Sequence, residues 1–509
     1  MSQPRKRALI SVYDKTQIEN AARILHENGW EILSTGGTAS HLRSNGIPVT
    51  EVSDLTGFPH ILDGRVKTLH PMVFGPILAR SEPDHLRQLH ELNTHAIDLV
   101  MVNFYPFEAA LEESGYSENE MVERIDIGGP SMVRAAAKNH ARVTVVVDPR
   151  DYLPVCRNLV QDKLDFQERR YLAQKAFAAT AHYDALISAY FTSDEAIPGD
   201  TLTFSGRKHL ELRYGENPHQ AAGLYLSSPL SPLKRMRQLQ GKALSFNNIL
   251  DATMVWEVLS RFDKKEPFCV IVKHQNPCGA AMREQLDKAF LAALEGDPVS
   301  AFGGIVGFNS RLDGQTAEHL KSLFLEVVVA PGFTPEAQRC LERKKNLRLL
   351  EIPLGFRERN DLRSVPGGFL WQQADHAVSG VDAFQNLTEH SPTKGELLDV
   401  EMGWRLIKFV KSNGILVVKD GSLIGVGPGQ MNRVEAVRIA LDKCGDQAKG
   451  AVLISDAFFP FPDSIELAAE KGIRVIVEPG GSIRDKEVIA AAQRLEMVLL
   501  FTGMRHFRH

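Results

Sequence analysis

The sequence predicts an α/β protein in two unequal parts, a parallel-sheet domain followed by a larger α/β half. Three observations support this class. The first 150 residues alternate short apolar runs with helical repeats, similar apolar runs return after residue 205, and a segment without periodicity separates the two. The apolar runs alternate little with polar residues, which is typical of strands that are buried on both faces by helices.

The elements of the first part follow from spacing and from stop signals. Ile18, Ala21, Ala22 and Leu25 recur at helical spacing, and Asn28-Gly29 ends that helix. A long helix closes the domain. We expect strands over 8–14, 30–34, 97–105 and 142–148, and helices over 15–29, from 35–40 and over about 166–191.

The segment 192–206 is rich in Thr, Ser, Asp, Gly and Pro and is the predicted linker. We therefore place domain boundaries at 1–198 and 199–509. The second part contains two strand-rich lobes, about 205–355 and 400–509, on either side of an irregular stretch, and no internal repeat is evident. Lys419-Asp420-Gly421-Ser422 predicts a hairpin and hence a mixed sheet. Its strands are expected at 268–273, 303–308, 326–331, 346–352, 414–419, 422–427, 451–455, 473–478 and 497–501.

Composition narrows the function classes. The 509 residues are 43% hydrophobic and 24% charged with a formal net charge of −4, so no global basic field indicates nucleic-acid binding. No apolar run approaches the roughly 20 residues that span a bilayer, and the N-terminus does not resemble a secretory signal. The five cysteines contain no C-x-x-C, which predicts neither a zinc site nor a disulfide framework. We expect a cytoplasmic protein.

Two glycine-rich loops at strand ends indicate anion binding in the first part. Thr35-Gly36-Gly37-Thr38 follows one strand, and Gly128-Gly129-Pro130-Ser131 opens a helix carrying Arg134 and Lys138. Glycine lets backbone amides approach an anion, and a helix N-terminus adds a favourable dipole. Each feature alone could be a turn or a surface charge. Together they suit a phosphorylated substrate and proton transfer, with further polar groups at Arg65, Lys67, Asn103, Tyr105 and Asp126.

In the second part, a lysine and a histidine end an apolar strand in FCVIVKHQNPCGAA, residues 268–281. We expect Asn276-Pro277-Cys278-Gly279 to form the turn that follows. Lys273 alone could be a solvated strand end, and His274 alone could be a structural histidine. Side by side, an ammonium and an imidazole can act as an electrostatic and acid–base pair.

Six motifs occur in order at matching spacing: GRVKTLHP, NFYPF, IDIGGPSMVRAAAKNHARV, LRYGENPHQ, KHQNPCG and SDAFFPFPDSI. From about residue 8 to 509 the chain resembles the bifunctional family of 5-aminoimidazole-4-carboxamide ribonucleotide (AICAR) transformylases and inosine monophosphate (IMP) cyclohydrolases. The resemblance implies a methylglyoxal-synthase-like parallel-sheet domain and a duplicated cytidine-deaminase-like half. It also implies formyl transfer from 10-formyltetrahydrofolate to the 5-amino group of AICAR, then dehydrative ring closure of formyl-AICAR to IMP.

For ring closure, the resemblance implies that Lys67, Tyr105, Asp126 and Lys138 are catalytic. Lys67 can stabilise charge on the formyl oxygen, and Asp126 can orient or deprotonate the carboxamide. Lys138, with Tyr105, can donate to the departing oxygen. The substrate-binding positions that match are Tyr13, Asp14, Lys15, Thr35, Gly36, Gly37, Thr38, Arg65, Thr68, Asn103, Ile127 and Gly128.

For formyl transfer, the resemblance implies that Lys273, His274 and Asn413 are catalytic. The 5-amino group of AICAR is a poor nucleophile, so His274 would remove its proton while Lys273 stabilises the oxyanion or protonates the folate nitrogen. Asn413 would hold the carboxamide or formyl oxygen. The matching nucleotide contacts are Arg213, Tyr214, Gly303, Glu326, Arg433, Phe458, Arg505 and His509, and the matching folate contacts are Asp463, Ser482 and Ile483.

The resemblance further implies a homodimer, the small molecules AICAR, formyl-AICAR, IMP and folate as partners, and no nucleic acid or membrane. The zinc-deaminase ligands H-x-E and P-C-x-x-C are missing, so we predict no catalytic metal. Tyr13 stands where the family usually has serine, and Phe74 and Pro76 replace histidine and glycine. Two rival readings stay open: a nucleotide-sensing regulatory protein, and an enzyme that has lost ring closure.

Overall fold

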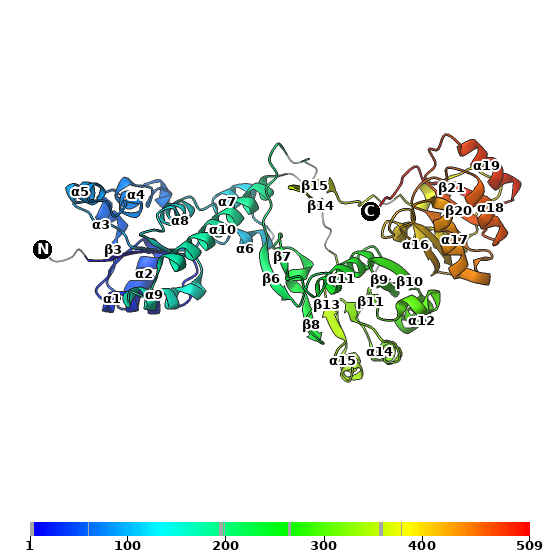
Figure 1. Cartoon of the computed structure of the whole chain (residues 1–509), viewed down its shortest axis with the longest axis horizontal. Helices are drawn as coiled ribbons and strands as arrows, with labels where there is room; N and C mark the ends of the chain where they lie inside the picture. The colour runs from blue at the N-terminus through cyan, green and yellow to red at the C-terminus, as the bar shows by residue number, and fades with distance from the viewer. Residues whose placement is uncertain are drawn as a thin grey trace. The chain divides into compact units, whose positions relative to one another are not determined.

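The structure is a computed structural model that describes residues 5–59, 61–113, 115–192, 197, 199–262, 266–355, 360–377 and 379–509. The chain separates into two compact units (Figure 1). Unit 1 comprises Met1–Arg207 with Ser227–Pro229, and unit 2 comprises Lys208–Leu226 with Leu230–His509. Part of the predicted linker lies outside the described residues.

Unit 1 contains a five-stranded sheet in which every strand pair is parallel. Its order is β3-β2-β1-β4-β5, so the central strand β1 pairs with β2 and β4. The apolar residues of the first two strands, among them Ala8, Leu9 and Ile10 in β1, are buried, as the sequence predicted. The strands are β1 (Arg7–Ser11), β2 (Glu31–Ser34), β3 (Thr50–Glu51), β4 (Leu99–Val102) and β5 (Thr144–Val146).

Helices cover both faces of this sheet (Figure 1). One buried cluster joins the sheet to α1 and α9, and another joins its opposite face to α4 and α8. The final helix coincides with the predicted run 166–191 and begins with a capping box from Asp165 and Glu168. The helices are α1 (Ile18–Glu27), α2 (Gly36–Ser44), α3 (Val52–Thr56), α4 (Pro71–Leu78), α5 (Pro83–Glu91), α6 (Phe107–Glu112), α7 (Glu118–Val122), α8 (Gly128–Lys138), α9 (Tyr152–Val160) and α10 (Phe166–Phe191).

Unit 2 is built on one mixed sheet of twelve strands. Its order is β16-β21-β20-β19-β17-β18-β10-β9-β11-β12-β13-β8, so both predicted lobes share a continuous sheet. The strands are β8 (Arg237–Gln240), β9 (Phe268–Lys273), β10 (Asn276–Met282), β11 (Ile305–Phe308), β12 (Val327–Ala330), β13 (Arg348–Glu351), β16 (Gln385–Asn386), β17 (Ile415–Lys419), β18 (Ser422–Gly427), β19 (Val452–Ser455), β20 (Val475–Glu478) and β21 (Val498–Phe501).

This sheet consists of two copies of one six-strand arrangement. The orders β10-β9-β11-β12-β13-β8 and β18-β17-β19-β20-β21-β16 correspond strand by strand. Corresponding pairs also share their parallel or antiparallel sense. The copies meet where β10 pairs with β18. The duplication implied by the family resemblance is therefore present in the topology, although no repeat was evident in the sequence.

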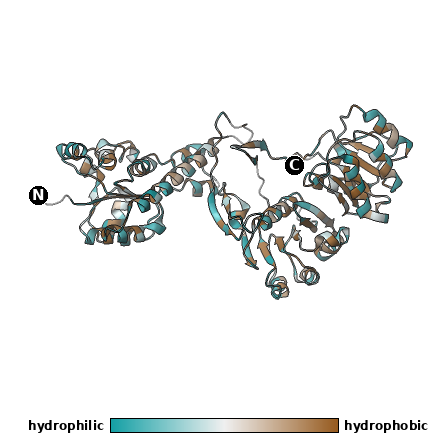
Figure 2. Ribbon diagram, viewed as in Figure 1, coloured by the Kyte–Doolittle hydropathy of each residue, from teal (hydrophilic) through white to brown (hydrophobic). Residues whose placement is uncertain are grey.

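The helices of unit 2 follow the same duplication. α11 and α16 contribute to one core that runs along one face of both copies. The opposite face carries two separate cores, one with α12, α14 and α15 and one with α17, α18 and α19. Figure 2 shows the apolar strands between amphipathic helices. The helices are α11 (Phe246–Leu259), α12 (Leu286–Gly296), α13 (Pro298–Ala301), α14 (Gly314–Leu320), α15 (Pro335–Leu341), α16 (Lys394–Ile407), α17 (Arg433–Cys444), α18 (Asp463–Glu470) and α19 (Asp485–Arg494).

The sequence predicted an irregular stretch between the two lobes, from about residue 355 to 400. This prediction is wrong for part of that stretch. It contains an antiparallel hairpin of β14 (Asn360–Val365) and β15 (Gly368–Gln373), and α16 begins before residue 400. A second two-stranded ribbon, β6 (Arg207–Leu212) with β7 (Ala222–Leu226), lies near the start of unit 2.

Candidate functional site

The first candidate site lies in unit 1, at the carboxyl ends of the parallel strands. Tyr13–Lys15 follows β1, Thr35–Thr38 follows β2, and Asn103–Tyr105 follows β4. Because the carboxyl ends of parallel strands share one edge of the sheet, these loops converge there. Asp126 precedes the N-terminus of α8, which adds a helix dipole to the same group.

Two polar side chains tie these loops together. Asn103 Oδ1 accepts hydrogen bonds from the amides of Tyr13 at 2.6 Å and Asp14 at 3.0 Å, and Asn103 Nδ2 donates to Tyr152 Oη at 2.8 Å. Thr38 Oγ1 contacts both the amide and the carbonyl of Val12, at 3.0 and 2.9 Å. Both predicted contact residues therefore also fix the loop geometry.

Asp126 is the central acidic group of this site. Its Oδ1 accepts the Gly129 amide at 2.9 Å, and the amides of Tyr105 and Gly128 also bond to the carboxyl. Burial raises the pKa of Asp126, while these amides and the Lys67 ammonium oppose the rise. A carboxylate whose pKa is raised is a better proton acceptor than an ordinary one, and the ammonium can stabilise negative charge beside it.

The glycines of both loops make room for polar side chains. A Cβ at Gly128 would lie 2.5 Å from Thr68 Oγ1, and one at Gly129 would lie 2.4 Å from Asp126 Oδ2. A Cβ at Gly36, whose φ is +51°, would lie 3.4 Å from Lys67 Nζ. Gly128 and Gly129 are thus needed for the close approach of Thr68 and Asp126, whereas Gly36 is favoured by its positive φ, and a Cβ at Gly37 would meet nothing within 4 Å.

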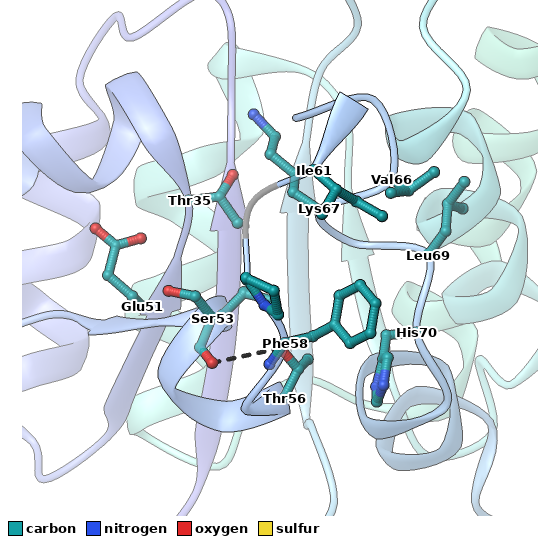
Figure 3. Close-up of a pocket in the computed structure, with 12 residues that line it drawn as sticks. Thr35, Glu51, Ser53, Thr56, Phe58, Ile61, Val66, Lys67, Leu69 and His70 are labelled. Atoms are coloured by element: carbon teal, nitrogen blue, oxygen red, sulfur yellow. Dashed lines mark hydrogen bonds between the residues drawn. The ribbon is translucent and has the colours of Figure 1, made fainter. Parts of the chain in front are cut away.

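A cavity of about 220 Å³ adjoins this group. Figure 3 shows Thr35 and Lys67 among its lining residues. Thr35 Oγ1 is buried and has no hydrogen-bond partner among the described residues, so it is available to a ligand. The cavity is also lined by residues that the sequence analysis did not identify as site residues: Glu51, Val52, Ser53, Thr56, Phe58, Pro59, Ile61, Val66, Leu69 and His70.

The remaining predicted residues of unit 1 differ in placement. Arg65 pairs with Glu123, with both side chains largely exposed, and Ile127 is exposed beside Gly128. The Tyr13 ring packs against Tyr105 with 5.5 Å between centroids. Lys138 lies at the opposite end of α8 from Gly128, about 15 Å along the helix axis, so the structure does not bring its ammonium to Asp126.

The departures at Phe74 and Pro76 lie in α4, which begins directly after the cavity-lining residue His70. Phe74 packs against the core beneath α8, and the Pro76 carbonyl accepts Arg142 Nη2 at 2.7 Å. Of the three departures, only Tyr13 lies among the clustered site loops.

The second candidate site lies in unit 2, at the β9–β10 hairpin. Asn276–Gly279 was expected to be a turn, which is wrong: β10 begins at Asn276, and Lys273 pairs directly with Asn276. The turn consists of His274 and Gln275, with φ of +52° and +58°. His274 is therefore the exposed tip of a two-residue hairpin loop and not the end of a strand.

Lys273 and its neighbours form the first half of this site. Lys273 Nζ donates to the Phe302 carbonyl, and a Cβ at Gly303 would lie 3.6 Å from the same nitrogen. Glu326 accepts Asn248 Nδ2 at 2.9 Å and pairs with Arg348 at 3.5 Å. Arg213 and Tyr214, whose guanidinium and ring stack at 5.2 Å, influence Arg348 electrostatically.

Asn413 and Arg433 form the second half. Arg433 Nη2 donates to Asn413 Oδ1 at 2.5 Å, and Asn413 Nδ2 donates to the Gln430 carbonyl at 2.7 Å. Arg433 also pairs with the fully buried Asp456. The Asn413 side-chain oxygen thus accepts a hydrogen bond from Arg433, and one of its two N–H groups donates to Gln430. The other N–H group can donate to a ligand oxygen.

Asn276 connects the two halves, since its Oδ1 accepts the Lys411 amide at 3.2 Å, two residues before Asn413. The loops that carry the predicted folate contacts are also joined. Phe459, which lies between the nucleotide contact Phe458 and the folate contact Asp463 in the sequence, donates its amide to Glu478 Oε2 at 2.5 Å. Burial raises the pKa of Glu478 to about 8. The guanidinium of Arg484, which follows Ser482 and Ile483, lies 4.6 Å from the Phe461 ring.

The C-terminus docks on unit 2, as the predicted contacts at Arg505 and His509 require. The amide of His506 donates to the Asp456 carbonyl at 3.0 Å, and Arg363 donates to the His509 carbonyl at 2.6 Å. Arg505 itself is exposed, with its guanidinium 4.7 Å from the Phe507 ring.

Two residues that sequence reasoning missed hold this site together. Asp251 on α11 accepts the Gln275 amide at 2.8 Å, and Asp456 anchors Arg433. Asp456 is the second residue of the SDAFFPFPDSI motif. An acidic residue between an apolar strand and a loop is the sequence signal that could have identified it. Asp251 had a signal in a short repeated pattern described below.

The described residues contain no group of three or more His, Cys, Asp or Glu side chains arranged to hold a metal ion. In the part of the chain that the structure describes, no helix has the length and apolar character needed to cross a membrane.

Comparison with known proteins gives two family matches. The AICARFT/IMPCHase bienzyme model matches residues 136–443, and an MGS-like domain model matches residues 17–131.

Curated relatives match along the full length. Proteins named bifunctional purine biosynthesis protein PurH are 46% identical in Desulfitobacterium hafniense, 47% in Aquifex aeolicus and 48% in Anoxybacillus flavithermus. Each alignment covers 99% of this chain and 100% of the relative. A solved structure titled crystal structure of ForH is 38% identical over 37% of this chain and 100% of that chain, with a TM-score of 0.34.

Proposed function

The chain belongs to the AICARFT/IMPCHase bienzyme family, and from this premise we propose that its two reactions occur at the two sites described above. It is an AICAR formyltransferase and IMP cyclohydrolase of purine biosynthesis, which transfers a formyl group to AICAR and closes formyl-AICAR to IMP. Ring closure is assigned to unit 1 and formyl transfer to unit 2. The formyl donor is 10-formyltetrahydrofolate, and no catalytic metal takes part.

In unit 1, the carboxamide nitrogen of formyl-AICAR attacks the formyl carbon, and the formyl oxygen leaves as water. Lys67 stabilises the negative charge on that oxygen, while Asp126 accepts the proton from the carboxamide. This division is supported by the raised pKa of Asp126 and by its electrostatic contact with Lys67. Tyr105 remains the proposed donor to the departing oxygen, whereas a role for Lys138 rests on the family resemblance alone, because its backbone lies about 15 Å along α8 from Gly128. The Tyr13, Thr35 and Gly128 loops are proposed substrate contacts.

In unit 2, the 5-amino group of AICAR attacks the formyl carbon of the folate. His274 takes the amine proton, and Lys273 stabilises the tetrahedral oxyanion. The folate nitrogen then leaves as a neutral amine, with its proton supplied by Lys273 or returned by the protonated His274. Asn413 donates its free N–H to the carboxamide or formyl oxygen. The exposed imidazole at the hairpin tip supports this role, because a base must reach the amine.

The full-length family match, together with the clustering of Lys67, Tyr105 and Asp126 in unit 1, is the observation that carries the proposal. The direct test is to incubate the protein with AICAR and 10-formyltetrahydrofolate and to measure IMP. A parallel reaction with formyl-AICAR alone measures ring closure, and a zinc chelator in both reactions tests for a metal. A protein that binds AICAR but forms neither formyl-AICAR nor IMP would support the nucleotide-sensing reading instead.

A fragment of residues 1–207 is expected to fold and to retain ring closure. It contains unit 1 up to Arg207, including the pair of Arg207 with Glu108 and the His182–Ser205 hydrogen bond. The measurement is IMP formation from formyl-AICAR, with the full chain as reference. A fragment of residues 1–198 lacks those two contacts and tests the predicted boundary. A folded but inactive 1–207 fragment would show that ring closure needs unit 2.

We also propose a homodimer that forms through unit 2, with formyl-transfer sites that draw on both subunits. The β14–β15 ribbon supports this, since it exposes Leu362, Val365, Phe369 and Leu370, and two-stranded ribbons are marginally stable alone. Dilution should then reduce formyl transfer before ring closure. Sedimentation across the same concentrations checks this, and a monomer with full formyl transfer would contradict it.

A cytoplasmic location is proposed as well, supported by the biosynthetic activity and by five cysteines that are all free thiols. Cell fractionation with an antibody to the chain measures the location directly.

A further inference from the structure

The duplicated sheet contains two equivalent hairpins with different tips. In one copy, His274 and Gln275 connect β9 to β10, and in the other, Asp420 and Gly421 connect β17 to β18. All four residues have positive φ, at +52° and +58° in the first tip and +49° and +66° in the second. Asp-Gly is a favoured pair for this turn, whereas His274-Gln275 contains no glycine to adopt positive φ without strain.

An aspartate holds each tip from the corresponding helix. Asp251 on α11 accepts the Gln275 amide at 2.8 Å and also bonds to the His274 amide. Asp399 on α16 accepts the amides of Asp420 at 2.9 Å and Gly421 at 2.6 Å.

The two helices share a sequence pattern that places these aspartates alike. Asp251 and Asp399 are each the sixth residue of a 14-residue helix. Both lie in the pattern Leu-Asp-x-x-Met-x-Trp, at 250–256 and 398–404. The aspartate support is therefore part of the duplicated fold, whereas the histidine belongs to one copy only.

We propose that Asp251 is a positioning residue for formyl transfer, which holds the His274 imidazole at the hairpin tip by accepting hydrogen bonds from both turn amides. The inference rests on the proposed role of His274 as the base. A left-handed turn without glycine persists only where its surroundings hold it. Without Asp251, the His274–Gln275 turn would relax toward ordinary backbone conformations, and the imidazole would leave its place.

The surroundings of Asp251 agree with this role. The side chain is partly buried, and burial raises its pKa. The two turn amides and His274 oppose this rise, whereas Glu326 adds to it. Asp251 thus interacts electrostatically with a proposed nucleotide contact, and it reaches the proposed base through the backbone amides of the turn.

Asp399 provides a matched control within the same chain. Asp251→Ala and Asp399→Ala each remove one aspartate that accepts two turn amides, so both should lower the unfolding temperature. Only Asp251→Ala should lower kcat for formyl transfer, by about 10- to 100-fold, with KM for AICAR within about threefold of the wild type. Ring closure of supplied formyl-AICAR should be unchanged in both variants.

A second substitution tests the mechanism. Glycine adopts positive φ without strain, and Gly421 occupies the position of Gln275 in the other copy. The double variant Asp251→Ala with Gln275→Gly should therefore regain at least about fivefold in kcat over Asp251→Ala. If Asp251→Ala does not fold, Asp251→Asn is used instead. The asparagine side chain keeps one acceptor oxygen for one turn amide but presents an NH₂ group, which cannot accept, to the other. Its kcat should fall about tenfold and rise again with Gln275→Gly.

Three results would overturn the inference: a folded Asp251 variant with wild-type kcat, an equal loss in Asp399→Ala, or no recovery with Gln275→Gly. Failure of the proposed function itself looks different. In that case the wild type transfers no formyl group, or His274→Ala is as active as the wild type.

Discussion

Replacing His274 by alanine is expected to lower formyl transfer by about 10²–10⁴-fold, the usual contribution of a general acid–base group. Ring closure of supplied formyl-AICAR should stay at the wild-type rate, because the imidazole lies in unit 2 and the ring-closing residues lie in unit 1. The exposed tip position means that truncation leaves no cavity in the core, so the fold should persist. The measurement is the rate of each half-reaction with its own substrate.

His390→Ala is the matched control, since this histidine is also exposed in unit 2 but lies outside the candidate site. It should leave both rates unchanged. Equal loss of both activities in a folded His274→Ala variant would contradict the assignment of one reaction to each unit. Retention of formyl transfer would instead remove His274 as the base.

The strands were predictable because burial on both faces leaves a clear sequence record. Runs such as 268–273, 414–419 and 451–455 are apolar except at their ends and match β9, β17 and β19 closely. The Asp420–Gly421 turn was equally predictable, since Asp-Gly is favoured where both φ values are positive. In these places local preference and tertiary structure agree.

The β9–β10 turn was not predictable, because the local signals point to the wrong residues. Pro277 and Gly279 suggest a turn but lie inside β10. A Cβ at Gly279 would be 2.0 Å from the Ala293 carbonyl oxygen, so this glycine permits close packing of α12. The true turn has neither glycine nor asparagine and depends on Asp251, a contact 24 residues away. Sites of this kind break local rules where function requires it.

The composition of the first site could be anticipated, but its internal arrangement could not. Strand ends and glycine pairs pointed to Lys67, Tyr105 and Asp126, which the structure groups. Gly128 and Lys138 are ten residues apart on one helix, which already implied that they lie far from each other. The family resemblance nevertheless placed both residues in the same site. The duplication in unit 2 was not evident from the sequence, because few residues are identical between the two copies. Asp251 and Asp399 are one such pair, about 148 positions apart.

The Lys67→Ala variant is expected to lose ring closure by about 10²–10³-fold, the usual effect of removing one group that stabilises a developing oxyanion. With AICAR and 10-formyltetrahydrofolate supplied together, formyl-AICAR should accumulate, because formyl transfer in unit 2 continues. Lys67→Arg should recover little, because a planar, delocalised guanidinium does not reproduce the compact point charge of the ammonium. Product analysis over time distinguishes the accumulated intermediate from IMP.

Lys163→Ala is the control for this last experiment, because Lys163 is an exposed lysine of the same unit that lies outside the candidate site. It should close the ring at the wild-type rate. If Lys67→Ala did the same, Lys67 would be an ordinary surface charge, and Asp126 would have to act without a cationic partner. A loss of ring closure together with a loss of formyl transfer would instead couple the two sites. The proposed separation predicts that ring closure is lost and formyl transfer is retained, because Lys67 lies near Gly36 and Gly64 and interacts electrostatically with Asp126, all of which belong to unit 1.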